Sequence, residues 1–398
     1  MAPGEPVNST VSAVVNSTTN LQSREPSLGA AWWRSMRAVL LPWFIFRGAL
    51  FSYIYAVRML GEQEGSYHGA VVGELNHKFW DCFIHWDAGW YERVARSGYA
   101  DPTAAAFFPA YPYAVRALSH VGISLWASSL WVSNACLLLA LSVLHVQLCK
   151  RTTKSQADFG VLGVLLFPTT VFFSAFYAES MYFAFVLAAF WFGHERRWWL
   201  AALAAAFASA TRSAGVFLGP SLALMFFLDD LAKKRQGLRR DWRPFLWLGV
   251  APMGLGVVMW MQHVQVGDAF AFVHVQASWG RGSGVWPWLP IPRDLLDTNL
   301  DCIRRADAVF AALGLLCAAG AWRLKHQGEA LFALVCVVIP LTTGSCWSCT
   351  RFVSVLPAVY ICWSHAAYKP LLRQWLLVAS TLACAIYTTR FVSGGWAG

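Results

Sequence analysis

Long apolar stretches separated by short polar ones run along most of the chain. About 20 apolar residues cross the hydrocarbon core of a bilayer as a helix, so each stretch is a candidate transmembrane helix. The candidates lie near residues 36–58, 121–148, 159–177, 180–193, 198–211, 214–231, 244–264, 304–322, 329–343, 351–367 and 371–391. Several are short or contiguous. The pattern predicts an all-α polytopic membrane protein with about eleven transmembrane helices.

Most lysines and arginines lie in short stretches between these apolar segments. Five such stretches, at 150–154, 196–197, 233–240, 323–325 and 369–373, fall on one side of the membrane together with Arg24, Arg34 and Arg37. The positive-inside rule makes that side cytosolic. The opposite side then carries the two longest loops, 59–120 and 265–303, and the short turns at 177–180, 211–214 and 342–350.

The first 31 residues are polar and rich in Ser, Thr and Asn. They lack the apolar h-region of a cleaved signal peptide, and we expect a disordered cytosolic tail. The sequons at Asn8 and Asn16 would then face the cytosol and stay unmodified. Residues 32–398 are expected to form one multipass transmembrane domain, and no internal repeat is visible.

The composition agrees with a membrane protein. Of 398 residues, 57% are hydrophobic and 13% are charged, which excludes an ordinary soluble enzyme and a disordered chain. The net charge of +10 is spread over the short basic stretches, so we expect no nucleic-acid partner. The ten cysteines lie mostly in apolar segments; Cys82 and Cys302 are able to meet outside the bilayer, and the lone CxxC of Cys346 and Cys349 is weak evidence for zinc.

The first noncytosolic loop contains the segment HWDAGWYERVARSGY, residues 85–99. It is too charged to span, but Trp90, Tyr91 and Val94 share one helical face, which favours an interfacial helix that Gly98 ends with a left-handed cap. Asp87 stands at its N-terminus and is either a simple N-cap or a functional acid. The following FFPAYP, residues 107–112, is expected to be rigid and non-helical.

Three further ionisable residues lie at turns on the same side. Glu179 has no cation beside it in sequence and is either a site residue or an acid that favours a helix N-terminus. Arg212 in ATRSAG and Arg351 after SCT lie at ends of spans, where arginines often only snorkel. Their shared side with Asp87 instead favours a base with a phosphate clamp.

The second long loop carries Gln276 and Trp279, with Arg281 and the proline-rich VWPWLPIP beyond them. Its aromatic residues either stack on sugar faces or form an interfacial aromatic belt, and the belt is the more common arrangement.

Five of these segments together resemble a known family. HWDAGWYERVARSGY, FFPAYP, FFSAFYAES (172–180), ATRSAG (210–215) and QASW (276–279) are similar in order, spacing and topology to the PIG-V family, the GPI mannosyltransferase II enzymes. The HWD and FFPxYP blocks carry most of the specificity. The resemblance extends from about residue 36 to 280; beyond residue 300 only hydrophobicity and Arg351-Phe352 at a luminal turn match.

The resemblance implies a multipass enzyme of the GT-C class in the endoplasmic reticulum membrane, with luminal interfacial helices and a luminal active site. Such a hexosyltransferase moves mannose from dolichyl-phosphate mannose to the first mannose of the GPI-anchor precursor, in an α1,6 linkage and with inversion. Both substrates are lipids held at the membrane. A small membrane partner subunit, reported for fungal relatives, is a further possible partner.

These implications assign roles to the candidate residues. One carboxylate base is needed for single displacement, and Asp87 is the choice, either removing the proton or positioning the acceptor. Arg212 and Arg351 would meet the charge of the leaving phosphate, while Glu179 orients the acceptor or holds Arg212. The remaining substrate-binding candidates are His85, Trp86, Tyr91, Gln276 and Trp279. No DxD motif is present in the noncytosolic loops, so we expect no metal and no cofactor for the chemistry.

Three other functions fit the sequence less well. Another transferase that uses a dolichyl-phosphate sugar, acting on a protein or glycan, is the nearest. A transporter or scramblase is expected to have ionisable residues near mid-span and repeated halves, whereas these residues gather at one face. A noncatalytic subunit of a transferase complex would tolerate free replacement of Asp87.

Overall fold

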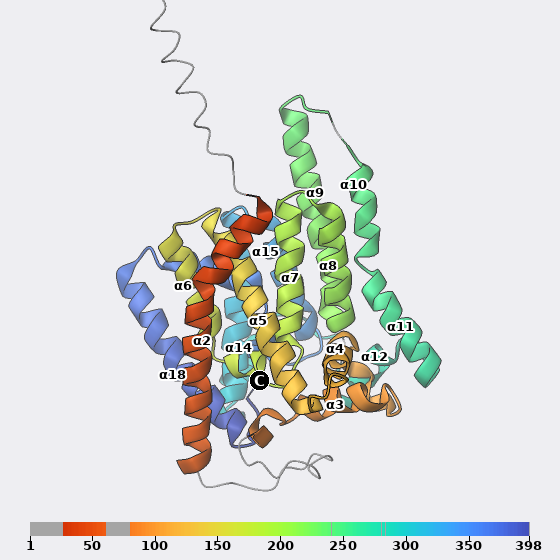
Figure 1. Ribbon diagram of the computed structural model, residues 1–398, viewed down its shortest axis with the longest axis vertical. Helices are drawn as coiled ribbons and strands as arrows, with labels where there is room; N and C mark the ends of the chain where they lie inside the picture. Colours follow the sequence, from red (N-terminus) through yellow and green to blue (C-terminus); the bar gives the residue numbers. More distant parts are fainter. Residues whose placement is uncertain (1–26, 61–79, 240, 280, 283, 398) are drawn as a thin grey trace, which may run out of the picture.

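The computed structural model describes residues 27–60, 80–239, 241–279, 281–282 and 284–397. In these residues the regular structure is entirely helical, and the long helices stand side by side as a bundle (Figure 1). Five segments are long and apolar enough to cross a membrane: Leu28–Leu60, Leu125–Cys149, Ser213–Arg235, Arg243–Val266 and Pro370–Val392. Two shorter helices, Trp198–Thr211 and Gln327–Leu341, are also apolar. The predicted all-α, multipass membrane fold is confirmed.

The bundle helices are α2 (Leu28–Leu60), α5 (Leu125–Cys149), α6 (Lys154–Leu165), α7 (Glu179–His194), α8 (Trp198–Thr211), α9 (Leu218–Arg235), α11 (Met253–Val266), α14 (Cys302–Arg323), α15 (Gln327–Leu341), α17 (Pro357–Ala366) and α18 (Pro370–Val392). Shorter elements lie between them: η1 (Trp80–Phe83), α3 (Asp87–Ser97), η2 (Pro102–Ala106), α4 (Ala110–Ser119), η3 (Thr170–Phe173), η4 (Ser213–Phe217), α10 (Arg243–Leu246), η5 (Trp247–Val250), α12 (Ala271–His274), η6 (Val275–Trp279), α13 (Pro290–Leu296) and α16 (Cys349–Val353).

The predicted spans at 159–177 and 351–367 do not form continuous transmembrane helices. The span at 159–177 is wrong, because α6 ends at Leu165, three residues before Pro168, and the chain continues through a turn into η3. Twelve helical residues rise only about 18 Å, too little to cross a bilayer alone. The span at 351–367 is divided into α16 and α17, because Pro357 starts a new helix and keeps the residue before it extended.

Smaller differences concern the ends of the predicted segments. The first helix begins at Leu28, inside the predicted tail of residues 1–31. Residues 1–26, which include both sequons, lie outside the described residues. FFPAYP is not wholly non-helical, since α4 begins at Ala110 and takes Pro112 into its first turn, where a missing N–H costs no helical hydrogen bond. Gly98 ends α3 with a positive φ of 62°, but its ψ of −136° is not that of the left-handed cap.

Two clusters of buried apolar side chains stabilise the protein. The larger one lies between the bundle helices and includes Phe183, Phe190 and Tyr360. The smaller one lies between α3, α4, η3 and the end of α18, and includes Tyr91, Tyr111 and Phe391. This second core packs α3, α4 and η3 together at one end of the bundle.

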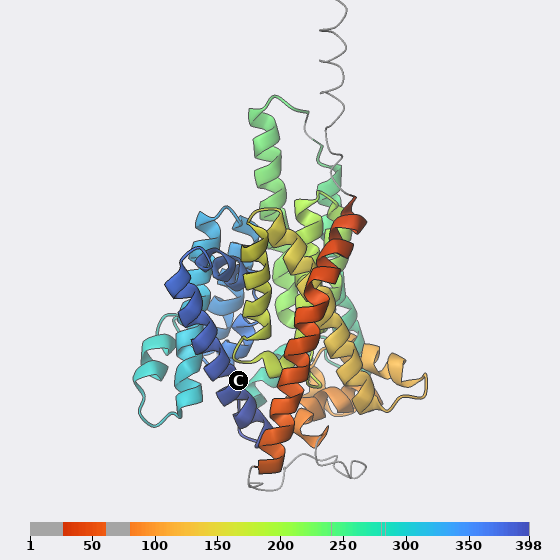
Figure 2. The same cartoon turned by 60° about the vertical axis from the view of Figure 1, so that its left-hand side comes forward.

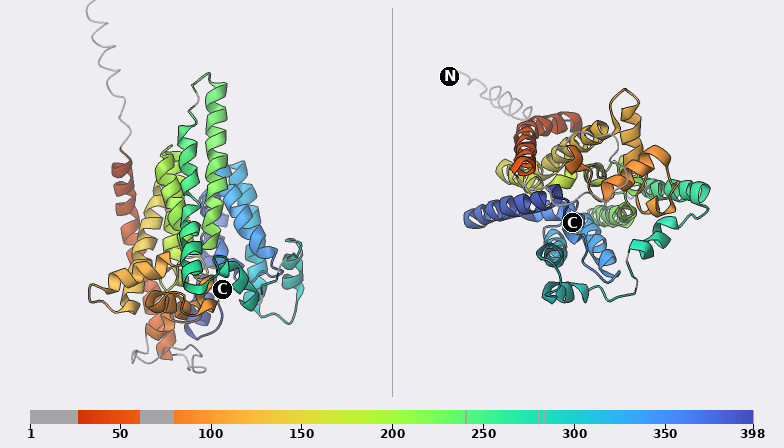
Figure 3. Two further views of the ribbon diagram at one scale, coloured as in Figure 1. Left: turned by 90° about the vertical axis from the view of Figure 1, so that its right-hand side faces the viewer. Right: turned by 90° about the horizontal axis from the view of Figure 1, so that it is seen from below.

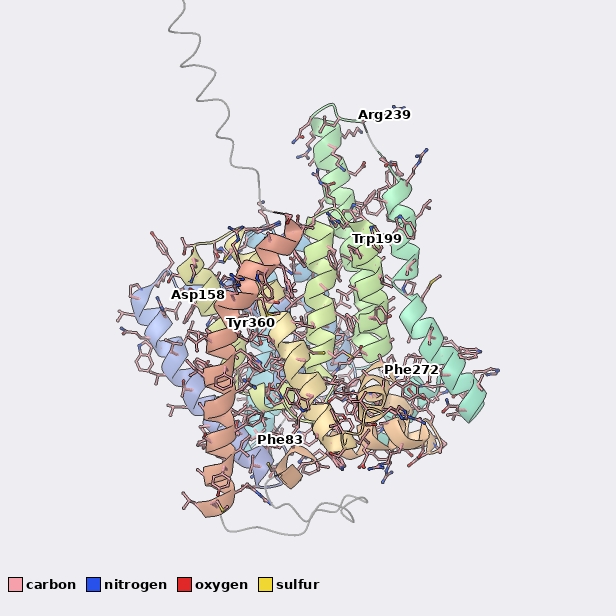
Figure 4. The ribbon with its side chains drawn as sticks, viewed as in Figure 1. Phe83, Asp158, Trp199, Arg239, Phe272 and Tyr360 are labelled. Carbon is pink, nitrogen blue, oxygen red and sulfur yellow. The ribbon has the colours of Figure 1, made fainter. Side chains whose placement is uncertain are left out.

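The two ends of the bundle differ in charge. Arg239 and Asp158 lie at one end, and Phe83 and Phe272 at the other (Figure 4). We call the end with Lys233, Lys234 and Arg239 the basic end, where α9 extends beyond the neighbouring helices (Figure 2). The opposite end, with α3, α4 and α12, is the loop end, and the C-terminus lies near the middle of the view from below (Figure 3). The loops predicted to share a side therefore do so.

Candidate active site

Asp87 is the first residue of α3 at the loop end. The chain turns into this helix at Trp86, which has a φ of 58°, a backbone conformation unusual for a non-glycine residue. The Asp87 backbone N–H donates to the Tyr177 hydroxyl at 3.2 Å, and that hydroxyl donates to the His85 carbonyl at 2.8 Å. Trp86 holds the N-cap position, so the Asp87 side chain is not the helix cap.

The Asp87 carboxylate belongs to a chain of four charged side chains. Arg351 Nη1 donates to Asp87 Oδ2 at 2.7 Å, and Arg351 Nε lies 3.3 Å from Glu179 Oε1. Arg212 Nη1 is paired with the same oxygen of Glu179. The four residues come from four separate elements, and the predicted convergence of two acids and two arginines is confirmed.

The two carboxylates differ in exposure. The Glu179 side chain is 1% exposed, whereas the Asp87 side chain is 15% exposed. Arg212 and Arg351 both pair with Glu179 Oε1, so this buried acid holds the two arginines together. Asp87 is therefore the carboxylate that a second molecule is able to reach.

Local structure places each of these side chains. Glu179 opens α7, where a negative charge is stabilised by the helix dipole. Arg212 follows α8 in extended backbone with φ −151° and ψ 145°. The chain then folds back on α8 so closely that a Cβ at Gly215 would lie 2.4 Å from the Ala208 carbonyl carbon, and only glycine fits there.

Asp307 fixes the segment that carries Arg351. This buried acid in α14 accepts from Ser348 N and Thr350 N, each at 2.9 Å, and from Thr350 Oγ1 at 2.7 Å. Ser348 has a φ of 68°, a strained conformation that these bonds hold in place. The sequence analysis missed Asp307; its one signal was an acid near the start of an apolar span.

Arg281 is a third arginine of the site that the sequence analysis mentioned without assigning it a role. Its guanidinium lies 5.7 Å from the Phe352 ring centre, against which Arg212 and Arg351 also pack, at 5.5 and 5.8 Å. Arg281 Nη1 donates to Gln276 Oε1 at 3.2 Å, so the predicted Gln276 contacts this arginine. Burial lowers the pKa of Arg281, and the positive charge of Arg351 adds to this.

Arg281 differs from the other two arginines in its partners. Arg212 is paired with Glu179 and Arg351 with Asp87, and the buried Asp307 also interacts with the charge of Arg351. No ion pair joins Arg281 to a carboxylate among the described residues. A guanidinium without such a partner in a largely buried site favours an anionic ligand.

Aromatic side chains border the charged residues. Trp90 stacks on Phe107 with ring centres 5.9 Å apart, and Trp279 packs edge-on against both at 5.3 and 5.7 Å. The Trp279 Nε1 atom is buried and has no hydrogen-bond partner among the described residues. Trp279 therefore packs in an aromatic wall with Trp90 and Phe107, and its side-chain N–H donor has no partner among the described residues.

Two of the predicted substrate residues, Tyr91 and His85, are buried in the protein, and a third, Trp86, is exposed. Tyr91 is 5% exposed and packs against Phe107 and Tyr111 below the charged groups. His85 is buried with its ring edge on Phe391, and burial followed by the charge of Arg58 lowers the pKa of His85 to about 4. Trp86 is 41% exposed, and its ring packs on Trp396 at 5.1 Å.

Among the described residues no disulfide is formed, and none joins Cys82 to Cys302. Cys346 and Cys349 are buried beside the Arg351 segment, where Cys346 N donates to Asp294 Oδ2 at 2.9 Å. The CxxC therefore lies in the loop that carries an active-site arginine.

A family model described as "Mannosyltransferase (PIG-V)" matches residues 31–280. The chain belongs to the PIG-V mannosyltransferase family. The match includes Asp87, Glu179, Arg212, Gln276 and Trp279, and it ends just before Arg281. The family is described as one of mannosyltransferases, a class of glycosyltransferase.

Two solved structures of an oligosaccharyltransferase from Archaeoglobus fulgidus are similar to this PIG-V family chain. One is a complex with Zn and sulfate, with a TM-score of 0.42 and 14% identity. The other is tethered through a disulfide bond with an acceptor peptide containing the NVT sequon, with a TM-score of 0.41 and 12% identity. Each alignment covers 89% of the PIG-V family chain. It covers 53% of the first oligosaccharyltransferase chain and 55% of the second, so the PIG-V family chain spans about half the length of these structures. No curated protein matches the sequence.

Proposed function

We propose that the protein transfers mannose from dolichyl-phosphate mannose to the first mannose of the GPI-anchor precursor, in an α1,6 linkage and with inversion. The loop end would face the lumen of the endoplasmic reticulum, and the enzyme would have the GT-C arrangement. The observation that carries the proposal is the Asp87–Arg351–Glu179–Arg212 network at the end opposite the basic stretches.

Asp87 is the general base of the proposed reaction. Its bond to Arg351 uses Oδ2, which leaves Oδ1 to accept the proton of the attacking hydroxyl. As this proton leaves, the acceptor oxygen attacks the anomeric carbon of mannose, and the bond from that carbon to the phosphate oxygen breaks on the opposite face. Glu179 is too buried to reach the acceptor and serves to hold the two arginines.

The three arginines supply the positive charge that the leaving group needs. The donor is a phosphodiester with one negative charge, and the departing dolichyl phosphate carries more. Arg281, which is not neutralised by an acid, is the main phosphate ligand, while Arg212 and Arg351 share their charges with Glu179 and Asp87. Such preorganised charge stabilises the transition state more than the ground state.

The Trp90–Phe107–Trp279 wall receives a sugar ring. Aromatic faces pack against the apolar face of a pyranose, and Trp90 and Trp279 are the partly exposed members of this wall. A site built at one end of a helical bundle also suits two substrates whose lipid tails stay in the bilayer.

The test uses the purified full-length protein with a synthetic one-mannose precursor. Dolichyl-phosphate mannose is expected to yield a two-mannose product with an α1,6 linkage, which glycosidase digestion and mass spectrometry identify. Transfer from a nucleotide-linked mannose, with none from the dolichyl donor, would contradict the proposal. Transfer from the dolichyl donor to a peptide or another glycan alone would instead favour the related transferases.

A further inference from the structure

Two histidines and a glutamate converge at the basic end, at the far end of α7 from the active site. His194 is the last residue of α7, His326 directly precedes α15, and Glu329 lies in the first turn of α15. One ligand atom from each side chain lies within 4.8 Å of the other two. None of the three was singled out by the sequence analysis, and the proposed transferase reaction does not use them.

The Glu329 carboxylate is buried without a lysine or arginine partner in the described residues. Its side chain is 1% exposed. Oε1 lies 2.6 Å from His194 Nε2 and 3.4 Å from His326 Nδ1, and Oε2 has no hydrogen-bond partner among these residues. A buried carboxylate is costly unless a cation compensates it, so a metal ion bound at this cluster would stabilise the ionised Glu329.

Arg151 contacts both histidines of the cluster. Its Nη2 lies 3.1 Å from His194 Nδ1, and its Nη1 lies 3.3 Å from His326 Nδ1. A guanidinium only donates, so the His194 Nδ1 atom accepts and the ring is neutral, with its proton on Nε2 facing Glu329. Neutral imidazole is the form that binds metal ions.

We propose that His194, His326 and Glu329 form a binding site for a divalent transition-metal ion, with Zn²⁺ as the best fit. Two histidines and one glutamate form a known three-ligand zinc set that leaves a fourth position for water. A cavity lined by His194, His326 and Arg151 lies beside the ligand atoms and provides room for that water.

Binding requires small side-chain movements. Zinc lies about 2.0–2.2 Å from nitrogen and oxygen ligands, so the rings must turn to bring the three atoms around one point. The His194 proton moves from Nε2 to Nδ1, and the Nδ1–H then repels the donor groups of Arg151. The ion therefore replaces the exposed Arg151 guanidinium as the compensating cation, and Arg151 competes with it.

The site joins two helices whose other ends lead to the active site. α7 begins with Glu179, and α15 is followed by the segment that carries Arg351. The sixteen residues of α7 separate the two sites by roughly 22 Å along the helix axis. A bound ion links the basic ends of α7 and α15 and stabilises the folded protein in proportion to its occupancy.

The experiment uses the full-length protein in detergent, without a polyhistidine tag and after treatment with a chelator. Zn²⁺ is titrated by calorimetry into the wild type and into Glu329→Gln, His326→Ala and Arg151→Gln. We expect one site per chain, with binding at least about tenfold weaker in Glu329→Gln and His326→Ala. Binding should be tighter in Arg151→Gln, because the competing cation is gone.

His120→Ala is the matched control, since His120 is an exposed histidine outside the cluster, and its Zn²⁺ affinity should equal that of the wild type. Circular dichroism verifies the helix content of each variant. Equal affinity in the wild type and in a folded Glu329→Gln variant would overturn the proposal. Weaker binding in Arg151→Gln would also overturn it, and this exposed substitution keeps the test valid if the buried variants fail to fold.

Discussion

Asp87 and Arg351 are 264 positions apart in the sequence, and their side chains are joined by a hydrogen bond of 2.7 Å. Asp87 opens a helix of the first long loop, whereas Arg351 belongs to α16, beyond the end of the family match. The pair therefore ties the C-terminal part of the chain to the N-terminal part at the proposed reaction centre.

Replacing Glu179 tests the support of the two arginines. Glu179→Gln leaves Arg212 and Arg351 buried with one anion fewer, and breaking such a pair costs about 3 kcal/mol or more. We expect a lower melting temperature in detergent together with a loss of mannosyl transfer. Glu195→Gln, whose partner Lys150 is 44% exposed, should leave both unchanged. Equal melting temperatures for the two variants would contradict this role of Glu179.

Arg281→Gln tests the phosphate clamp. The substitution removes a positive charge that no acid neutralises by an ion pair in the described residues, but it keeps a polar side chain near Gln276. We expect kcat to fall by about 10²–10³, the usual effect of losing one group that stabilises transition-state charge, with weaker donor binding. Arg116→Gln, an exposed arginine at the end of α4, is the control. The measurement is steady-state kinetics with the dolichyl donor. Wild-type rates in both variants would refute the assignment of Arg281 as a phosphate ligand.

Asp307→Asn tests the positioning of Arg351. Asparagine has one carbonyl oxygen and an NH₂ group, so it cannot accept from both Ser348 N and Thr350 N. Because a misplacement of about 1 Å costs roughly 100-fold in rate, we expect a large fall in kcat with little change in KM. Asp297→Asn, in the same region but outside the site, should have no effect. An unchanged kcat for a folded Asp307→Asn would show that Arg351 is held by other contacts.

The buried His85 should make the free energy of unfolding depend on pH. Its pKa is about 4 in the folded protein and about 6.5 when unfolded, because burial and the charge of Arg58 oppose protonation. The stability that depends on neutral His85 is present above pH 6.5 and is lost as the pH falls toward 4. Melting temperatures of His85→Phe should fall less than those of the wild type over this range; parallel curves would exclude His85 as the cause.

Much of the fold and part of the site could be predicted from the sequence. Hydrophobic stretches fix helices such as α5 and α18 because length and apolar composition are local properties. The basic stretches indicate which loops lie on the cytosolic side of the membrane. The turns that carry Asp87, Glu179, Arg212 and Arg351 were therefore assigned to the opposite side. Glu179 lies between apolar residues with no cation nearby, so its need for a partner was visible although the partner was not.

The rest depends on contacts between distant segments. The short α6 and the divided α16 and α17 are tolerated because the non-helical residues between them are buried in protein rather than exposed to lipid. Arg281 and Asp307 gain their roles from Phe352 and from the Ser348–Thr350 backbone, which no local pattern reveals. Tyr91 and His85 were expected to be substrate-binding residues, but Tyr91 is buried against Phe107 and His85 against Phe391.

The most direct test compares GPI precursors in cells that lack this transferase and express the wild type, Asp87→Asn or Asp101→Asn. Asp101 is the matched acid of the same loop, and its pair with Arg93 is partly exposed. We expect Asp87→Asn to accumulate the one-mannose precursor, with activity at least about 100-fold lower, and Asp101→Asn to act like the wild type. Full activity of Asp87→Asn at equal expression would contradict the account.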